Sequence, residues 1–278
     1  MTILEGRESL PPSLRDAVVV ATAKRRLGGC IAQVRLPDGR DAIVKTGRDA
    51  ERIGLLREHR NTSALRGVLP VPTVIGFHDD GDIVALAETR LHGQPLHLAC
   101  QERGRADTLA LLAAVLNTMW TIPRAAMEMR LSVDEELADI AGLIRKGLLD
   151  PQAFQAASGG RTIEGAYAEV RALVATHDKC DFVHGDFCLP NIMVDRDGSW
   201  GLIDLGRSGF GDRLRDLASL EKSLRRNVDE RAFADLLDRM KMPLRDSASE
   251  KMRVYALLDA FWEAMALAPI KRVVLASP

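Results

Sequence analysis

The chain has 278 residues, a formal net charge of −1, 28% charged residues and 46% hydrophobic residues. This length allows one large domain or two lobes with an ample core, and the composition is ordinary for a globular protein. The near-neutral charge lacks the basic excess typical of nucleic-acid binding, and no uncharged run is long enough to span a bilayer. We therefore expect neither a nucleic-acid partner nor a membrane partner.

Cysteine usage and the first residues indicate the compartment. The four cysteines are scattered without a C-x-x-C pair, which argues against a disulfide framework or a zinc site and fits a reducing cytosol. Residues 1–8 lack the apolar core of a signal peptide. We expect a cytoplasmic protein that is a monomer or a weak dimer.

Short strands separated by turns are predicted for the first part of the chain. Residues 17–23, 30–36 and 41–46 are rich in apolar and β-branched residues, and P-D-G at 37–39 is a strong turn. Gly28, Gly29 and Cys30 lie between the first two strands. They either let backbone N–H groups approach a phosphate or form a plain hairpin turn.

The strand that ends at Lys45 and the following helix suggest a phosphate site. A-I-V-K at 42–45 resembles the kinase strand whose lysine meets nucleotide phosphates, although a lysine at a strand end is more often only solvated. Residues 49–66 are predicted to form a helix that contains Glu58, our candidate ion-pair partner for Lys45. Glu51 is the rival, and a solvent-exposed helical glutamate is the simpler alternative for both.

A hinge between two lobes is expected at residues 87–93. L-P-V-P at 69–72 ends the helix, because proline removes a donor and restricts the residue before it. Residues 73–77 and 82–87 then form a predicted hairpin. The backbone groups of Glu88, Thr89 and Arg90 are candidates for hydrogen bonds to a nucleotide base. The predicted lobes are residues 1–90, which bind the nucleotide, and residues 91–278.

The second lobe is predicted to be mainly helical. Apolar residues recur at helical spacing in most of it, and residues 150–165 are expected to be a loop or a short helix with a loop. An acidic cluster at 134–136 is most simply compensation of a helix dipole. Asp216 is expected to anchor the neighbouring loop by hydrogen bonds. The predicted helices are 107–122, 132–146, 164–179, 212–226, 229–240 and 247–266.

Two short motifs carry the chemistry. Residues 184–191 have the form H-G-D-x-x-x-x-N, and residues 203–206 have the form I-D-x-G, with a D-x-D-G turn between them. The spacing matches a protein-kinase catalytic loop and metal-binding aspartate. Asp186 is then the group that takes a proton from a hydroxyl, and Asn191 and Asp204 offer hard oxygen ligands to Mg²⁺. The competing interpretation is that these are ordinary turn residues.

With these motifs the sequence resembles the aminoglycoside phosphotransferases, above all the branch that phosphorylates the 3′-hydroxyl of kanamycin-type drugs. H-G-D at 184–186, C-L-P-N-I at 188–192, I-D-L-G-R-S-G at 203–209, L-P-V-P at 69–72 and L-L-D-A-F at 257–261 carry the resemblance. It implies an α+β, protein-kinase-like fold with a small antiparallel β-rich lobe containing one helix and a larger helical lobe. It also implies transfer of the γ-phosphoryl group of a magnesium nucleotide, ATP or GTP, to a cationic antibiotic.

The sequence departs from this family near the nucleotide phosphates and in the acceptor region. Cys30 stands where the family often has a serine. Residues 151–160 contain no carboxylate, whereas the matching loop of the kanamycin-modifying branch is rich in Asp and Glu, and Ala260 stands where an acidic residue often lies. Asp259 and Glu263 remain as candidate acidic contacts to the acceptor.

These departures leave several acceptors and activities open. Streptomycin-like drugs, cationic peptide antibiotics of the capreomycin and viomycin type, and an ordinary hydroxylated metabolite are alternatives to a kanamycin-type acceptor. A non-catalytic kinase-like binding protein is disfavoured, because Lys45, Asp186, Asn191 and Asp204 are all present. A metal-dependent hydrolase that uses His184 is disfavoured by the lysine strand and the glutamate helix that precede it.

Overall fold

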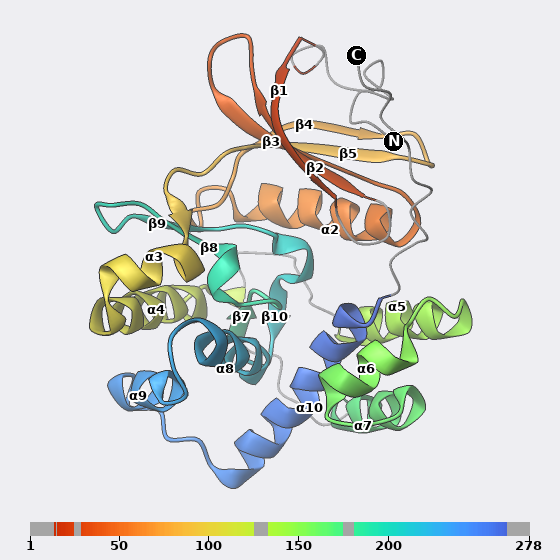
Figure 1. Ribbon diagram of the computed structural model, residues 1–278, viewed down its shortest axis with the longest axis vertical. Coiled ribbons are helices and arrows are strands. Elements are labelled where there is room, and N and C mark those ends of the chain that lie inside the picture. The colour runs from red at the N-terminus through yellow and green to blue at the C-terminus, as the bar shows by residue number, and fades with distance from the viewer. Residues whose placement is uncertain (1–13, 15, 25–28, 125–132, 175–180, 266–278) are drawn as a thin grey trace.

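The computed structural model describes residues 14, 16–24, 29–124, 133–174 and 181–265. They form two stacked lobes, an antiparallel sheet above a single helix and a larger body made mostly of helices (Figure 1). This confirms the predicted α+β, protein-kinase-like architecture. None of the helices that the structure describes combines the length and the apolar run needed to cross a bilayer.

Five antiparallel strands make the sheet of the first lobe, in the order β1-β2-β3-β5-β4. Each strand lies within two residues of its predicted position, because apolar and β-branched runs are bounded here by turn residues. The strands are β1 (Val18–Lys24), β2 (Cys30–Arg35), β3 (Asp41–Gly47), β4 (Val74–Asp79) and β5 (Val84–Thr89).

The two faces of the sheet bury different sets of side chains, since successive residues of a strand point to opposite sides. One face buries small apolar residues such as Ala32 and Val44. On the other face, Val84 and Leu86 pack on Leu55 of helix α2 (Asp49–Leu65). Lys45 lies opposite Leu86 in the β3–β5 register, so its side chain points toward the helix.

The second lobe contains the predicted helices and one that the sequence analysis did not predict, α3, which Gly104 ends at a positive φ of 77°. The segment predicted as a loop or short helix forms α6, because the Asp150 carboxylate caps the backbone N–H groups of Gln152 and Ala153. The helices are α3 (Leu96–Arg103), α4 (Arg105–Trp120), α5 (Val133–Arg145), α6 (Pro151–Ser158), α7 (Ile163–Val174), α8 (Leu214–Asn227), α9 (Ala232–Arg239) and α10 (Asp246–Glu263).

Two small sheets carry the motif loops. Strands β8 and β9 form the predicted hairpin, and β8 also pairs with β6; in the other sheet β7 pairs with β10. Both sheets lie below helix α2, with β8 and β9 next to it and β7 and β10 deeper in the second lobe (Figure 1). The strands are β6 (Gln94–Pro95), β7 (Asp181–Val183), β8 (Ile192–Val194), β9 (Trp200–Leu202) and β10 (Gly209–Gly211).

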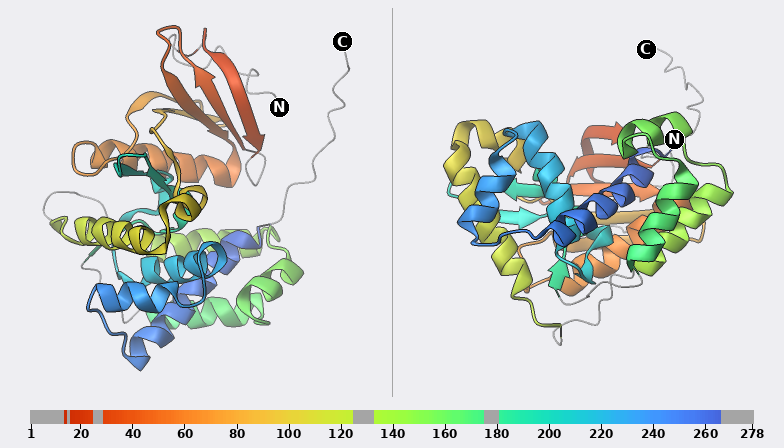
Figure 2. Two further views of the ribbon diagram at one scale, coloured as in Figure 1. Left: turned by 60° about the vertical axis from the view of Figure 1, so that its left-hand side comes forward. Right: turned by 90° about the horizontal axis from the view of Figure 1, so that it is seen from below.

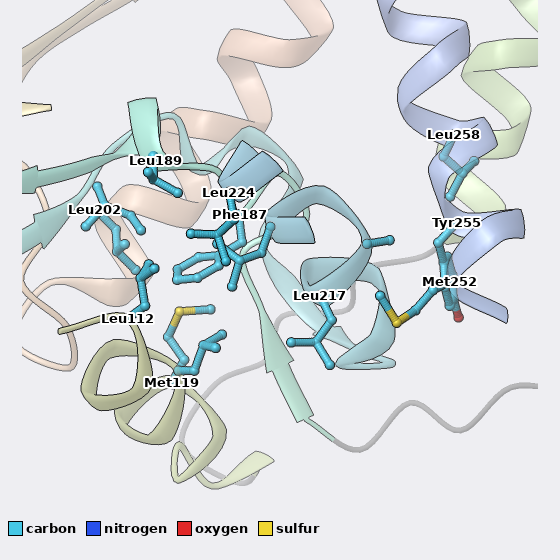
Figure 3. Packing of buried hydrophobic residues seen from close by; sticks show 14 of the residues in the cluster. Leu112, Met119, Phe187, Leu189, Leu202, Leu217, Leu224, Met252, Tyr255 and Leu258 are labelled. Atoms are coloured by element: carbon cyan, nitrogen blue, oxygen red, sulfur yellow. The ribbon is translucent and has the colours of Figure 1, made fainter. Parts of the chain in front are cut away.

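A continuous apolar core supports these loops from below. Phe187, the residue after Asp186, is fully buried and lies among Leu112, Met119 and Leu224 from α4 and α8 (Figure 3). Truncating such a buried ring costs about 3–5 kcal/mol, because a cavity is left behind. The core therefore holds the backbone next to Asp186 in one place.

Helix α2 joins the lobes. The side-chain amide of Asn61, 1% exposed, donates to the backbone oxygens of Leu205 at 2.8 Å and Ser208 at 3.0 Å. Arg57 of the same helix forms a 2.8 Å ion pair with Asp139 of α5. The left view of Figure 2 shows α2 between the sheet and the second lobe.

Candidate active site

The backbone of the H-G-D motif is anchored by a buried carboxylate. Asp216 of α8 is 0% exposed and accepts 2.8 Å hydrogen bonds from the backbone N–H groups of His184 and Gly185. Burial raises the pKa of Asp216, and these two hydrogen bonds oppose that rise by favouring the charged form. The predicted anchoring role of Asp216 is confirmed.

The ring of His184 connects the two motif loops by hydrogen bonds. Its Nδ1 atom accepts from the backbone N–H of Asp186 at 3.3 Å, so Nε2 carries the hydrogen and donates to the backbone oxygen of Ile203 at 3.0 Å. The ring is fully buried. It therefore ties the first motif to the second and is not placed as a metal ligand, which removes the basis for the hydrolase alternative.

Gly185 is required by the close approach of the two motif loops. Its φ is +80°, and a Cβ atom built there would lie 2.2 Å from the backbone oxygen of Arg207. Any side chain at this position would clash with that backbone. The arginine that protein kinases carry here has no room in this chain.

Asp186 and Asn191 face one another across the turn of the loop. The amide nitrogen of Asn191 donates to the backbone oxygen of Asp186 at 2.9 Å and to its carboxylate Oδ2 at 3.2 Å. Asp186 is half-buried and lines the cleft, whereas Asn191 is buried. With its nitrogen used in this way, Asn191 keeps its side-chain oxygen for another partner.

Asp204 is held in an uncommon backbone conformation. Its φ of 61° and ψ of 55° lie in the left-handed region, which few non-glycine residues adopt. The N–H of the preceding Ile203 donates to the backbone oxygen of Asn191 at 3.1 Å. The strained turn therefore presents Asp204 to the same cleft as Asp186.

Lys45 lies beside this group within a cluster of carboxylates. Its ammonium pairs with Glu58 of α2 and lies 3.4 Å from Glu88 of β5, and all three side chains are buried. Burial lowers the pKa of Lys45, but the negative charges of Glu58, Glu88 and Asp204 raise it by more, so the ammonium stays protonated. The rival partner, Glu51, lines the open cleft instead.

The predicted phosphate loop is described only in part. Gly28 lies outside the described residues, and Gly29 is buried just before β2. The Cys30 thiol donates to the backbone oxygen of Ala23 on the neighbouring strand at 3.4 Å. This contact joins the thiol to the backbone of the sheet.

The hinge residues are partly engaged in the sheet. The N–H groups of Thr89 and Arg90 donate to the backbone oxygens of Thr73 and Asp41, at 2.9 and 3.2 Å. A nucleotide base at this hinge would meet the carbonyl groups of these residues or a later N–H. Sequence analysis treated Glu88 only as hinge backbone, whereas the strand register turns its side chain toward Lys45.

A cleft of about 540 Å³ opens in front of Asp186 and Asp204. Helices α8 and α10 form its second-lobe walls. Asp259 of α10 accepts from the Ser219 hydroxyl at 2.8 Å and lies 3.8 Å from the Arg207 guanidinium. Glu263, one turn along α10, forms a 2.5 Å ion pair with Lys222 of α8.

The surroundings of Asp259 raise the pKa of its carboxyl group. Burial and the negative charge of Asp186 raise its pKa to about 6, while Arg207 and the Ser219 hydroxyl act in the opposite direction. The thiol of Cys188 lies in the same cleft, and burial together with Asp186 raises its pKa as well. Cys188 is therefore a neutral thiol at neutral pH and not a nucleophile.

A buried polar network that sequence analysis missed supports the cleft. Glu136 of α5 is 3% exposed and is paired with Arg215, while the indole N–H of Trp262 donates to it at 2.6 Å. Arg215 also donates to the backbone oxygen of Gly185 at 3.1 Å. Arg207 stacks on the Trp262 ring, 4.5 Å from its centroid. Glu136 thus serves a buried ion pair, not the helix dipole assigned to it from sequence.

The oxygen donors at the cleft fit Mg²⁺. Among the described residues, no group of three or more His, Cys, Asp or Glu side chains forms a closed metal cage. Mg²⁺ does not need one, since it takes one or two protein oxygens together with substrate phosphates and water. The amide oxygen of Asn191 and the carboxylate of Asp204 are a donor set of this kind.

Most of the chain matches one family of known enzymes. Residues 22–255 match the phosphotransferase enzyme family. An aminoglycoside 3′-phosphotransferase of Escherichia coli is 26% identical over 226 residues, which is 80% of this chain and 81% of that protein. Another, from Niallia circulans, is 27% identical over 199 residues, 71% of this chain and 75% of that protein.

Solved structures agree with the sequence comparison. The crystal structure of an aminoglycoside 3′-phosphotransferase of type VIII superposes with a TM-score of 0.76 at 25% identity, over 90% of this chain and 94% of that one. A streptomycin and ADP complex of an aminoglycoside phosphotransferase from Streptomyces rimosus shares the fold, with a TM-score of 0.67 at 23% identity, over 83% and 90% of the two chains. With the family match spanning most of its length, the chain belongs to the phosphotransferase enzyme family.

Proposed function

We propose that this protein is an aminoglycoside O-phosphotransferase that moves the γ-phosphoryl group of a magnesium nucleotide to a drug hydroxyl and so confers resistance. The observation that carries the proposal is that Asp186 and Asp204 line one cleft, with Asn191 hydrogen-bonded to Asp186 and the charge of Asp204 acting on Lys45. The matched 3′-phosphotransferases support a 3′-hydroxyl as the acceptor atom. A cytoplasmic location follows from the need for a nucleoside triphosphate.

Asp186 is the proposed catalytic residue. Its carboxylate is fixed by the Asn191 amide at 3.2 Å and by the backbone contacts that hold the loop. From this position it orients the acceptor hydroxyl and accepts its proton as the new O–P bond forms and the bond to the leaving diphosphate breaks. Because the loop is anchored by buried groups, the carboxylate needs little reorganisation during the reaction.

Lys45 and Glu58 are proposed to hold the nucleotide phosphates, between the predicted lobes at residues 1–90 and 91–278. The raised pKa of Lys45 keeps a positive charge near the phosphates, and Glu58 fixes its direction. Asn191 and Asp204 would hold Mg²⁺, which when bound neutralises phosphate charge. Asp259 and Glu263 are proposed acceptor contacts at the far side of the cleft.

A second acceptor class is favoured by the charge of the cleft wall. Lys222 and Arg226 of α8 line it together with Arg207, and α6 offers no carboxylate. Asp259 and Glu263 are already matched with Arg207 and Lys222. A less densely cationic acceptor of the streptomycin type suits this wall better than a drug with many ammonium groups.

A coupled assay tests both candidates. Purified protein is incubated with Mg-ATP or Mg-GTP and a panel of kanamycin-type, streptomycin-type and cationic peptide antibiotics, and products are analysed by mass spectrometry. A mass gain of one phosphate on a 3′-hydroxyl supports the first candidate, and a gain only on streptomycin-type drugs supports the second. Absence of phosphorylated product across the panel would contradict both candidates.

A further inference from the structure

The side chain of Glu88 occupies a position that its neighbours determine closely. Glu88 is the next-to-last residue of β5 and lies directly opposite Ile43 of β3. Ile43 and Lys45 are two residues apart, so Glu88 points to the same face of the sheet as Lys45. It is 3% exposed and stands where the strand runs into the hinge.

Only one of the two oxygen atoms of this buried carboxylate has a partner among the described residues. Its Oε2 atom lies 3.4 Å from the ammonium of Lys45, which is already paired with Glu58. Its Oε1 atom is buried and has no hydrogen-bond partner among the described residues. Buried polar atoms in folded proteins nearly always have a partner, so an acceptor left open here needs a donor from outside the described chain.

The proposed function supplies a donor in this position. If phosphates lie at Lys45 and the base lies at the hinge, Glu88 stands between the two, beside the edge of the base. A carboxylate only accepts hydrogen bonds. Adenine carries an amino group, a donor, at its 6-position, whereas guanine carries a carbonyl oxygen, an acceptor, at the same place.

We propose that Glu88 reads the 6-substituent of the purine and makes this enzyme select ATP over GTP. This inference rests on the proposed function, because it requires a nucleotide at Lys45. The open Oε1 atom accepts from the adenine amino group. Facing guanine, the same atom meets another acceptor, and two buried acceptors without a shared hydrogen repel each other.

Three nucleotides isolate the effect in the unmodified protein. ATP, GTP and inosine triphosphate are compared, since inosine has the 6-carbonyl of guanine but lacks its 2-amino group. We expect kcat/KM for ATP to exceed that for both 6-carbonyl nucleotides by about a hundredfold. Equal use of ATP and inosine triphosphate would overturn the proposal.

Two carboxylate-to-amide variants separate base selection from support of Lys45. Glu88→Gln introduces an amide that both donates and accepts hydrogen bonds. The ratio of kcat/KM for ATP to kcat/KM for GTP should therefore fall below about tenfold. Glu58→Gln removes the other carboxylate partner of Lys45. We expect it to lower kcat/KM equally for both nucleotides and to leave their ratio unchanged. The ratio is independent of how much of each variant is folded.

Binding measured without an acceptor distinguishes this inference from the proposed function. Nucleotide-dependent thermal stabilisation of the whole chain is recorded with each magnesium nucleotide. Selective stabilisation by ATP that Glu88→Gln abolishes supports the inference even if no antibiotic is phosphorylated. Efficient antibiotic phosphorylation with an unchanged ratio in Glu88→Gln refutes the inference and leaves the proposed function standing.

Discussion

Two parts of the cleft are built by different means: the proposed phosphate side, at Asp186, Asn191 and Asp204, and the proposed acceptor side, on α8 and α10. On the phosphate side, Asp186, Asn191 and Asp204 come from one loop and the hairpin after it. Hydrogen bonds on Gly185, Asn191 and Ile203 hold the backbone at or next to each of them. On the acceptor side, charged side chains of α8 and α10 neutralise one another across the cleft. The first arrangement depends on buried backbone contacts, whereas the second depends on pairs of charged side chains, whose charge single substitutions can change.

The largest expected effect is on the phosphate side. Asp186→Asn keeps the size of the side chain but removes the base, so kcat should fall by about a thousandfold or more. Nucleotide affinity, measured by titration calorimetry with Mg-ATP, should stay nearly unchanged. Asp197→Asn, in the turn of the same hairpin, is the matched control and should retain full kcat. A kcat of Asp186→Asn near that of the control would rule out the proton-accepting role.

The next largest effect tests the network that joins the two sides. Arg215→Met leaves the buried carboxylate of Glu136 without its cation, and the free energy of unfolding should fall by about 3–5 kcal/mol. Denaturant unfolding monitored by circular dichroism measures it. Arg225→Met, an exposed ion pair on the same helix, should change stability by less than about 1 kcal/mol. Similar losses in the two variants would show that the buried network contributes nothing special.

The activity toward a cationic acceptor should depend on pH through Asp259. Because the folded-state pKa of Asp259 is raised to about 6 from an ordinary value of 3.8, the group is neutral at pH 5 and charged at pH 7. For a cationic acceptor, kcat/KM should rise across this window with an inflection near pH 6. Asp259→Asn should remove that inflection, while an inflection retained in the variant would assign it to another group.

The raised pKa of Asp259 should lower the stability of the fold as pH rises, whereas kcat/KM for a cationic acceptor should rise with pH. A carboxyl whose pKa is raised on folding resists ionisation in the folded state, so stability should fall as pH rises from about 4 to 6. The Asp259→Asn variant should lack this decline. Thermal unfolding midpoints of the two proteins across the pH range provide the measurement.

The smallest expected effect concerns the exposed end of the acceptor wall. Arg226→Glu replaces a cation that lines the cleft with an anion, and the KM for a kanamycin-type drug should fall about fivefold. Arg225→Glu makes the same charge change outside the cleft lining and is the control. A drop of equal size in both variants would point to general attraction of the drug and not to a contact in the cleft.

The sequence predicted the phosphate side well because its chemistry is local. The spacing between Asp186 and Asn191 is set within one loop, and a turn of a few residues brings Asp204 back beside them. Sequence spacing thus equals spatial proximity there. The five strands of the first lobe were predicted for a similar reason, since each is bounded by its own turn residues.

Contacts between distant segments escaped prediction. Glu136 and Arg215 are 79 residues apart, and nothing in either local pattern shows that they meet. Glu88 was assigned to the hinge by its position in the chain, and only the register with β3 turned its side chain toward Lys45. Helix α3 was not predicted, because its apolar and polar residues are hardly separated on two faces and no side chain caps its first turn.

The two hydrogen bonds from Asn61 have a consequence for regulation. They fasten helix α2 to the backbone at Leu205 and Ser208, and Gly206 between those residues lets the helix come close, with the Gly54 oxygen 3.1 Å from where a Cβ would stand. Because both hydrogen bonds are buried, an outward swing of α2 that separates Glu58 from Lys45 would have to break them. We therefore expect the ion pair to be formed before any nucleotide binds, so that the site needs no inward movement of α2 to assemble it.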